Sequence, residues 1–381
     1  MRSCAVAVIG LGLMGSAALH ALTRAGADAL GFDPLQLGEA RGSSHGSCRI
    51  YRRFNFESQA YTALGDQAFE GWRALEAASG RTILMPCQVL EAGPPGSALV
   101  QGSRAAAAQV APLAGRASGA EANALFPAFS LPDDWDVVLQ DSGGILLAEA
   151  AVRACRELSG ERIVPAAARL TPTPAGLRIE AGGETYLAGQ AIVAAGPWIA
   201  GLVPALASHI TITRQTVGWF APAAPGRVAY GDFPIFLIEG PHGVVYGFPD
   251  FEGRGVKAAG HDHGPVVSPD AWDPPASDLE LAPVARTLAE LIPGAAGPIV
   301  ERDVCLYTNT RPADVRLDLG EEFIIDRLPQ DRRIIVASPC SGHGAKFASA
   351  IGGMLARLAL EPGFEADPAF RLDRFSSFAA A

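Results

Sequence analysis

Short apolar runs alternate with glycine turns and helical patterns from the start of the chain. Val6–Ile9 is an apolar run suited to a buried parallel strand, and the glycine-rich segment Gly10–Gly15 follows it directly. A helical pattern then runs from about Met14 to Ala25 and stops before Gly26, since glycine readily adopts the left-handed cap conformation. A second apolar run, Ala29–Phe32, leads to an acidic residue, Asp33. This pattern predicts a strand, turn, helix and strand in sequence.

The glycine turn has the spacing of a dinucleotide-binding site. Gly10 allows the tight turn, Gly12 lets the backbone approach a pyrophosphate, and Gly15 lets helix and strand pack closely. The helix N-terminus at Leu13 and Met14 would face the phosphates, and Asp33 stands where an acid can bind the ribose. A glycine loop that only packs is the alternative. The unit by itself does not distinguish FAD from NAD, because both cofactors use it.

The remaining pattern predicts two interleaved α/β domains. Helical patterns recur at Tyr61–Ala78, Leu147–Leu158 and Ala345–Leu360, and apolar strands at Gln190–Val193 and Ile334–Ala337. Alternating strands with Pro/Gly-rich loops fill 210–317, which indicates an antiparallel sheet. We therefore expect a Rossmann-like dinucleotide domain from 1–82, 145–209 and 318–381, and a sheet domain for the substrate from 83–144 and 210–317.

Charge and composition exclude several classes of partner. The formal net charge of −10 argues against nucleic acid and anionic membranes, which both require a basic surface. Met1-Arg2 leads straight into the first strand and no apolar run is long enough to span a bilayer, so we expect a cytoplasmic protein. The six cysteines show neither CxxC pairs nor metal spacing with histidine, and we expect no metal site and no disulfide.

Basic residues in this acidic chain mark the candidate chemistry. The small polar loop 41–47, which contains Ser43 and His45, is suited to lie against a ligand, and Arg49, Arg52 and Arg53 follow it. A solvated basic face is the alternative for these arginines. The chain has two lysines, Lys257 and Lys346, while its other basic residues are arginine or histidine.

Six ordered segments resemble one known family, the monomeric sarcosine oxidases and N-methyltryptophan oxidases. The segments are Gly10–Gly15 with Asp33, His45–Arg52, Tyr246–Pro249, Gly255–Lys257, Cys305–Thr308 and Ser341–Phe347. The resemblance spans almost the whole chain. It implies FAD rather than NAD, a fold like that of glycine oxidase and D-amino-acid oxidase, a monomer, and oxidation of a secondary (N-methyl or cyclic) amino acid. Hydride would pass to flavin N5, an imine would form, and O2 would reoxidise the flavin to give H2O2.

The resemblance also assigns roles to individual residues. Cys305 matches the covalent attachment site for FAD, which needs a lowered thiol pKa in an electropositive pocket, with Arg49 and His45 as sources of positive charge. Lys257 matches a lysine near N5 that stabilises superoxide during reoxidation. A structural buried cysteine and a surface lysine are the respective alternatives.

The substrate site follows from the same resemblance. Arg52 and Lys346 match a clamp for the substrate carboxylate. Tyr246 and Tyr307 match aromatic residues lining the pocket, and His261 matches a polar group beside it. The Ser341–Gly344 turn, with Gly342, His343 and Gly344, would direct helix N-terminal amides at the flavin ring.

Departures from the family pattern leave the substrate side chain open. Cys48 replaces an expected hydroxyl residue, Asn55 stands where an aromatic residue is expected near the mouth, and Arg53 and Arg254 are extra basic residues. They favour a larger or acidic substrate, including a primary amine. The sequence also permits an FAD dehydrogenase with another electron acceptor, an NAD-linked dehydrogenase, or a dinucleotide-binding protein without catalysis.

Overall fold

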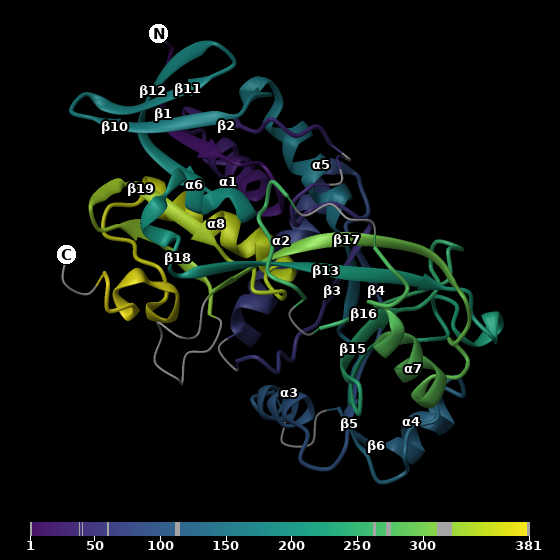
Figure 1. The fold of residues 1–381 in the computed structure, drawn as a ribbon. Helices are drawn as coiled ribbons and strands as arrows, with labels where there is room; N and C mark the ends of the chain where they lie inside the picture. Colours follow the sequence, from purple (N-terminus) through teal and green to yellow (C-terminus); the bar gives the residue numbers. More distant parts are fainter. Residues whose placement is uncertain are drawn as a thin grey trace.

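The structure is a computed structural model that describes residues 2–37, 39, 41–58, 61–110, 115–261, 264–271, 276–310 and 322–378. Within these ranges, two large sheets and one small sheet organise the chain. Figure 1 shows the N-terminal sheet with its helices in one half of the molecule and the second sheet, with α7 (Ala282–Leu291), in the other. The long strands β13 (Ile210–Phe220) and β17 (Ile299–Thr310) run between the halves.

The first sheet is built around β1 (Arg2–Ile9), which is flanked by the parallel strands β2 (Ala29–Phe32) and β12 (Glu184–Val193). Two further parallel pairings extend it, β2 with β9 (Ile163–Val164) and β12 with β19 (Asp331–Ser338). Antiparallel neighbours complete it: β10 (Ala168–Thr173), β11 (Gly176–Ala181) and β18 (Ile324–Leu328). Helix α1 (Leu13–Arg24) connects the parallel strands β1 and β2 as a crossover. The predicted Rossmann-like unit is therefore present.

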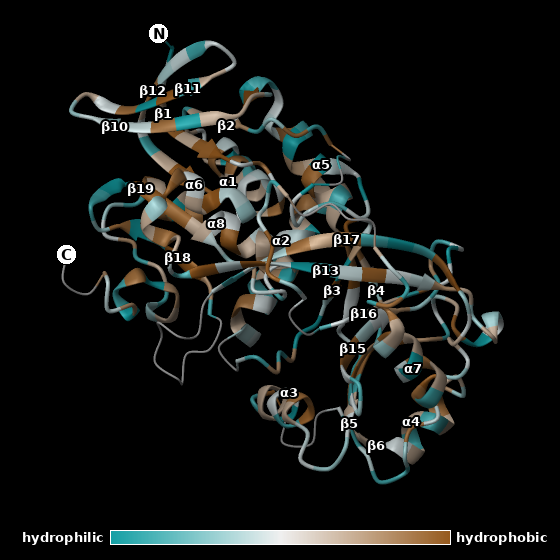
Figure 2. Ribbon diagram, in the orientation of Figure 1, coloured by the Kyte–Doolittle hydropathy of each residue, from teal (hydrophilic) through white to brown (hydrophobic). Residues whose placement is uncertain are grey.

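Helices pack on the first sheet through an apolar core. These are α1 (Leu13–Arg24), α2 (Tyr61–Ser79), α5 (Ala148–Ser159) and α8 (Ala348–Leu360). Leu19 of α1, Ile335 of β19 and Leu355 of α8 are fully buried in one cluster. Figure 2 shows hydrophobic residues concentrated where α1, α8 and β19 pack together. Burial at roughly 25 cal/mol per Å² makes this cluster a main source of stability.

The second sheet is mixed rather than purely antiparallel. It runs β17-β13-β16-β15-β14-β5-β7-β6 in the described part of the chain. Bounds not yet given are β5 (Val89–Gly93), β6 (Arg116–Ser118), β7 (Asp136–Gln140), β14 (Ile235–Gly240), β15 (Gly243–Phe248) and β16 (Val256–Gly260). The described strands within 210–317 pair antiparallel, as predicted, whereas the pair of β14 with β5, a strand from outside that range, is parallel. The sequence gap of more than 140 residues between these strands removes the short turn that would enforce antiparallel pairing.

Smaller elements connect the two halves. A three-stranded antiparallel sheet joins β3 (Cys48–Tyr51), β8 (Gly144–Leu147) and β4 (Leu84–Pro86). The helices α3 (Ala98–Ala108) and α4 (Gly119–Leu125) cover the outer end of the second sheet (Figure 1). The exact boundaries of the two interleaved domains stay a prediction.

None of the helices in the described ranges combines the length and apolar character needed to cross a bilayer. Helix α2, with 19 residues, has one buried and one exposed side: Trp72 is fully buried, whereas Glu70 is exposed. It therefore packs on the core through its apolar side.

Candidate active site

The glycine turn between β1 and α1 has the close contacts that its sequence predicts. Gly10 has a φ of +88°, and a Cβ there would lie 2.6 Å from the carbonyl oxygen of Ala194. A Cβ on Gly15 would lie 1.8 Å from the carbonyl oxygen of Gly10. Both positions therefore require glycine.

Asp33 lies at the end of β2 beside this turn and is 7% exposed. Its Oδ2 accepts hydrogen bonds from the Leu11 amide at 2.5 Å and from Arg156 Nη2 at 3.2 Å. Its Oδ1 accepts one from the Leu35 amide at 2.7 Å. These bonds fix the carboxylate at the rim of a large cavity, where a ribose would be held.

This dinucleotide cavity lies between the first sheet and the loop 41–45. Its lining includes seven of the predicted cofactor residues, together with the turn after β12 and the end of β19: Gly10, Gly12, Leu13, Met14, Asp33, Ser43, His45, Ala194–Trp198 and Ala337–Cys340. Gly15 packs beneath the turn and does not line the cavity among the described residues.

Three buried polar atoms at this cavity fit a polar ligand. Thr308 Oγ1, Ser338 Oγ and His45 Nδ1 have no hydrogen-bond partner among the described residues, and all three residues line the cavity. An unsatisfied buried group costs about 1–3 kcal/mol. A dinucleotide, rich in hydroxyl and phosphate oxygens, would satisfy such groups, so the donor set fits FAD.

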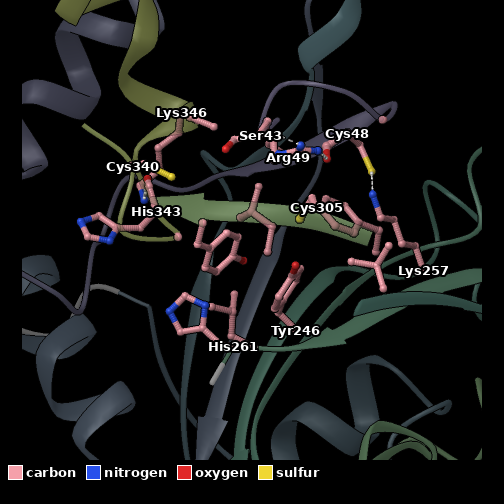
Figure 3. A pocket seen from close by; sticks show the side chains of 18 of the residues that line it. Ser43, Cys48, Arg49, Tyr246, Lys257, His261, Cys305, Cys340, His343 and Lys346 are labelled. Atoms are coloured by element: carbon pink, nitrogen blue, oxygen red, sulfur yellow. Dashed lines mark hydrogen bonds between the residues drawn. The ribbon is translucent and has the colours of Figure 1, made fainter. Parts of the chain in front are cut away.

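A second, narrower cavity continues from the first, because Ser43, His45, Cys340 and Ala345 line both. It collects most of the remaining predicted site residues in one place (Figure 3): Arg49, Arg52, Tyr246, Lys257, His261, Cys305, Tyr307, Gly342, His343 and Lys346. Lys346 and Lys257 lie toward opposite ends of the view, with Cys305 between them. Segments far apart in the sequence thus converge where a flavin ring and a small substrate would meet.

Arg49 is held in place at this cavity by three backbone carbonyl groups. Its guanidinium donates to the carbonyl oxygens of Cys48, Ser43 and His45 at 2.7, 2.9 and 2.8 Å. His45 Nε2 lies 2.8 Å from the Val304 carbonyl oxygen, and burial lowers the His45 pKa. The imidazole is therefore neutral near pH 7, and Arg49 rather than His45 supplies positive charge here.

Cys305 lies on β17 with its side chain in the cavity. Burial raises the pKa of its thiol, although Arg49 and Lys257 act in the opposite direction. The lowered thiol pKa that we expected is therefore wrong for the protein alone, because two cations do not outweigh the cost of burying a thiolate. Leu306, the next residue, points away into apolar packing, so Cys305 and Tyr307 share one face of the strand.

Lys257 on β16 is 6% exposed and is not a surface lysine. Its Nζ lies 3.6 Å from Cys48 Sγ, and 5.1 and 5.7 Å from the ring centroids of Trp219 and Phe248. The buried ammonium thus contacts two aromatic faces and the Cys48 sulfur, and Figure 3 shows its contact with the sulfur.

The two predicted clamp residues meet around a carboxylate that the sequence analysis did not identify. Arg52 and Lys346 are each 3% exposed. Glu57 forms an ion pair with Arg52 Nη2. Burial would raise the pKa of Glu57, but Arg52 and Lys346 hold that pKa well below its usual range. An acid five residues after Arg52 in a basic segment was the signal that could have located it.

Lys346 precedes α8, in a short 3-10 turn at Ala345–Phe347. Its Nζ donates to the carbonyl oxygen of His343 at 2.8 Å. Burial lowers the pKa of Lys346 to about 7, against the opposing effect of Glu57. The clamp therefore contains one permanent cation and one that titrates near neutrality.

Tyr246 and Tyr307 line the cavity, as predicted, and together form its aromatic wall. Tyr246 on β15 and Tyr307 on β17 share a hydrogen bond through their side chains, and burial raises the pKa of Tyr246 to about 12. The His261 ring lies edge-on to Tyr246 and to Phe56, with centroid distances of 6.2 and 5.8 Å. Both phenols are neutral near pH 7 and can act as hydrogen-bond donors.

The turn before α8 differs from its expected role. The amides of Ser341, His343 and Gly344 already donate to the carbonyl oxygens of Thr308, Cys340 and Cys340. These three donors are therefore engaged within the protein rather than directed at a flavin. Gly342 packs against the Tyr307 ring, and a Cβ on Gly344 would lie 1.8 Å from the Pro339 carbonyl oxygen, so both glycines shape the turn.

Of the four departures that favoured a larger or acidic substrate, Cys48 lines the cavity beside Lys257, and the other three lie outside it. Asn55 is fully buried, and its side-chain amide donates to the Arg53 carbonyl oxygen at 3.0 Å. Arg53 pairs with Asp66 at 2.7 Å, and Arg254 pairs with Glu301 and Glu252. None of the three lines the cavity among the described residues. These three residues therefore do not support an acidic substrate, and the larger or acidic substrate stays a prediction.

No group of three metal-ligating side chains occurs in the part of the chain that the structure describes. All six cysteines are free.

Comparisons with known proteins identify the family of this chain. Residues 5–358 match the family described as DAO, FAD dependent oxidoreductase. Monomeric sarcosine oxidase of Bacillus sp. (strain B-0618) is 33% identical over 95% of this chain and 93% of its own. N-methyl-L-tryptophan oxidase of Yersinia pestis (strain Pestoides F) is 31% identical over 97% of this chain and 98% of its own. This family match removes the NAD-linked alternative.

Solved structures confirm the fold class. NikD, described as an unusual amino acid oxidase essential for nikkomycin biosynthesis, superposes with a TM-score of 0.81 at 20% identity, over 96% of each chain. Glycine oxidase from Geobacillus kaustophilus gives a TM-score of 0.75 at 14% identity, over 94% of this chain and 95% of that one. The chain belongs to the DAO family of FAD dependent oxidoreductases, within which the monomeric sarcosine oxidases and N-methyl-L-tryptophan oxidases are among its relatives.

Proposed function

We propose that this enzyme oxidises a secondary amino acid, N-methylated or cyclic, with O2 as electron acceptor, and works as a monomer. The observation that carries the proposal is the buried pair Arg52 and Lys346, placed beside an aromatic wall in the cavity that continues from the dinucleotide cavity. Two desolvated cations beside a redox cofactor select a carboxylate ligand over a simple amine. The relatives named for sarcosine and N-methyl-L-tryptophan support the same substrate class.

Because Glu57 already pairs with Arg52, a substrate carboxylate can bind Arg52 only by displacing Glu57. Its carboxylate pairs with Arg52 and its Oε2 has no partner among the described residues. A substrate carboxylate would take the place of Glu57 at Arg52, so Arg52 is paired with a carboxylate both before and after substrate binding.

The aromatic wall orients the rest of the substrate. The hydroxyl groups of Tyr246 and Tyr307 and the apolar side chains of Ile50, Leu237 and Phe248 line the space next to the clamp. With the carboxylate anchored, these groups would direct the amine and its α-carbon toward the flavin side and limit the side-chain size. Bound FAD supplies the redox chemistry there, accepting a hydride equivalent so that the amine becomes an imine, and O2 restores the cofactor with release of H2O2.

Two residues on the flavin side have separate tasks. Cys305 would hold FAD through a thioether, and Lys257 would stabilise the negative charge that forms on O2 as it is reduced. The ammonium is held by Cys48 Sγ at 3.6 Å in a water-poor site, where such charge is most effective. We also propose a cytoplasmic location.

An anaerobic titration tests the function. The purified yellow protein is mixed with sarcosine, N-methyltryptophan, pipecolate, proline and primary amino acids while the flavin absorbance is followed. Bleaching by a secondary amino acid supports the proposal, and bleaching by primary amines alone contradicts the substrate class.

The acceptor needs its own measurement. After anaerobic reduction, air is admitted and H2O2 is quantified against substrate consumed. One equivalent of peroxide supports an oxidase. Slow reoxidation by air with fast reoxidation by a dye favours the alternative, an FAD dehydrogenase with another acceptor.

A further inference from the structure

A second buried carboxylate, Glu91, lies behind the clamp. It occupies the middle of β5, between Val138 of β7 and Leu237 of β14, and is fully buried. Arg52, its ion-pair partner, lines the substrate cavity, and Glu91 does not, among the described residues. Glu91 therefore reaches the site only through the guanidinium.

Both carboxylate oxygens of Glu91 are engaged. Oε1 accepts from Arg52 Nη1 at 2.9 Å, and Oε2 accepts from Gln140 Nε2 at 2.9 Å. These two hydrogen bonds fix the carboxylate, and burial raises its pKa while Arg52 opposes that change.

Gln140 extends the same network to the backbone that carries Arg52. Its Oε1 accepts from the amides of Arg53 and Phe54 at 3.1 and 2.8 Å. The Glu91–Gln140 pair thus holds the guanidinium and the start of the following loop together on the rigid second sheet.

The arrangement divides the guanidinium between two tasks. Nη1 is bound to Glu91, whereas Nη2 is bound to Glu57. Arg52 also stacks on Phe56, with its Cζ 4.3 Å from the ring centroid. Because Glu91 fixes Nη1 and Phe56 covers one face of the guanidinium, Nη2 faces the carboxylate that occupies the clamp, whether from Glu57 or from the substrate.

We propose that Glu91 is a positioning residue, which orients the Arg52 guanidinium so that its Nη2 end faces the substrate carboxylate. This inference rests on the proposed function, because it assumes that the substrate carboxylate binds Arg52. It predicts that the length of the Glu91 side chain controls the affinity for carboxylates, while its charge matters less.

Two variants separate length from charge. Glu91→Asp keeps the charge and withdraws the carboxylate by one methylene, so Nη1 loses its 2.9 Å contact. Glu91→Gln keeps the length and an acceptor oxygen. Glu239→Asp is the matched control: it lies on the neighbouring strand β14 and accepts from Ser97 Oγ and the Leu99 amide at 2.8 and 3.0 Å, away from Arg52.

The readout is the KM for an amino acid substrate and for its amide, which lacks the carboxylate. We expect Glu91→Asp to raise KM for the acid by about tenfold with KM for the amide and kcat nearly unchanged, since one charge-assisted hydrogen bond is misplaced. Glu91→Gln should change KM for the acid by less than about threefold, and Glu239→Asp should change neither value.

Equal losses on acid and amide in Glu91→Asp, or a larger loss on the acid in Glu91→Gln than in Glu91→Asp, overturn the proposal. If Glu91→Asp does not fold, a large acid-specific loss in Glu91→Gln still overturns it, and near-normal values support it. If the wild-type enzyme oxidises neither acid nor amide, the proposed function fails instead, and the dissociation constant of a simple carboxylate then tests Glu91 by the same comparison.

Discussion

Carboxylate binding should weaken as the pH rises through neutrality, because Lys346 loses its proton. Burial lowers the pKa of this lysine to about 7, and it is the titrating member of the clamp, whereas Arg52 stays charged. Below that pH the ammonium is present and binding is strongest. Above that pH the Lys346 side chain is neutral, and part of the free energy of carboxylate binding is used to protonate it.

The size of the effect follows from the contact that the ammonium would make. A hydrogen bond to a charged group contributes about 1.5–3 kcal/mol, which corresponds to about one to two pH units in the pKa of bound Lys346. The dissociation constant should therefore be flat below about pH 7, rise by up to about tenfold per pH unit above it, and level off about 10- to 100-fold weaker near pH 9.

The assay uses a small carboxylate without an amine, such as propionate, so that the ligand itself does not titrate. Binding is followed by the change in flavin absorbance at each pH. Two neighbouring groups, Glu57 and His343, do not explain the profile: Glu57 stays ionised because its pKa is held well below the usual range, and burial lowers the pKa of His343 to about 4.

Two variants identify the group. Lys346→Arg keeps its charge over this range and should bind without the pH dependence, whereas Lys346→Met should bind weakly at every pH. A wild-type dissociation constant that does not change between about pH 6 and pH 9, or a rise that persists in Lys346→Arg, would refute the assignment.

Three further outcomes follow from the site. At about pH 6, Glu57→Gln should tighten propionate binding by about tenfold, because the competing internal carboxylate is removed; weaker binding would contradict the displacement of Glu57. Lys257→Met should slow reoxidation by O2 by about 10²-fold and leave anaerobic reduction nearly unchanged in stopped-flow traces, and equal losses in both steps would count against its role. Cys305→Ala should release its flavin into the supernatant after acid precipitation while the wild type retains it, and a yellow Cys305→Ala pellet would exclude a thioether at this position.

The local part of this molecule could be predicted from its sequence. The glycine turn, α1 and Asp33 form one continuous segment whose spacing determines its geometry, and the structure reproduces it. The convergence of the other predicted residues in one cavity came from a family resemblance rather than from periodicity, because their contacts join segments hundreds of residues apart.

The ion-pair partners of charged side chains could not be predicted from the sequence. Arg53 and Arg52 are neighbours in sequence, yet one pairs with Asp66 at the surface and the other with Glu91 in the interior. Glu91 in an apolar strand gives no sign that an arginine 39 residues earlier compensates its charge. Likewise, Asn55 looks like a loop residue but is buried against backbone carbonyls.

The shared strand face of Cys305 and Tyr307 limits how this enzyme can be redesigned. Two residues apart on a strand, they are separated by about 6.5–7 Å along the backbone, and pairing with Gln215 and Thr213 of β13 holds that spacing rigid. Insertion of a single residue between them would turn one side chain to the opposite face. Attempts to admit bulkier amino acids should therefore alter Ile50 and Leu237 on other elements of the cavity, and leave β17 untouched.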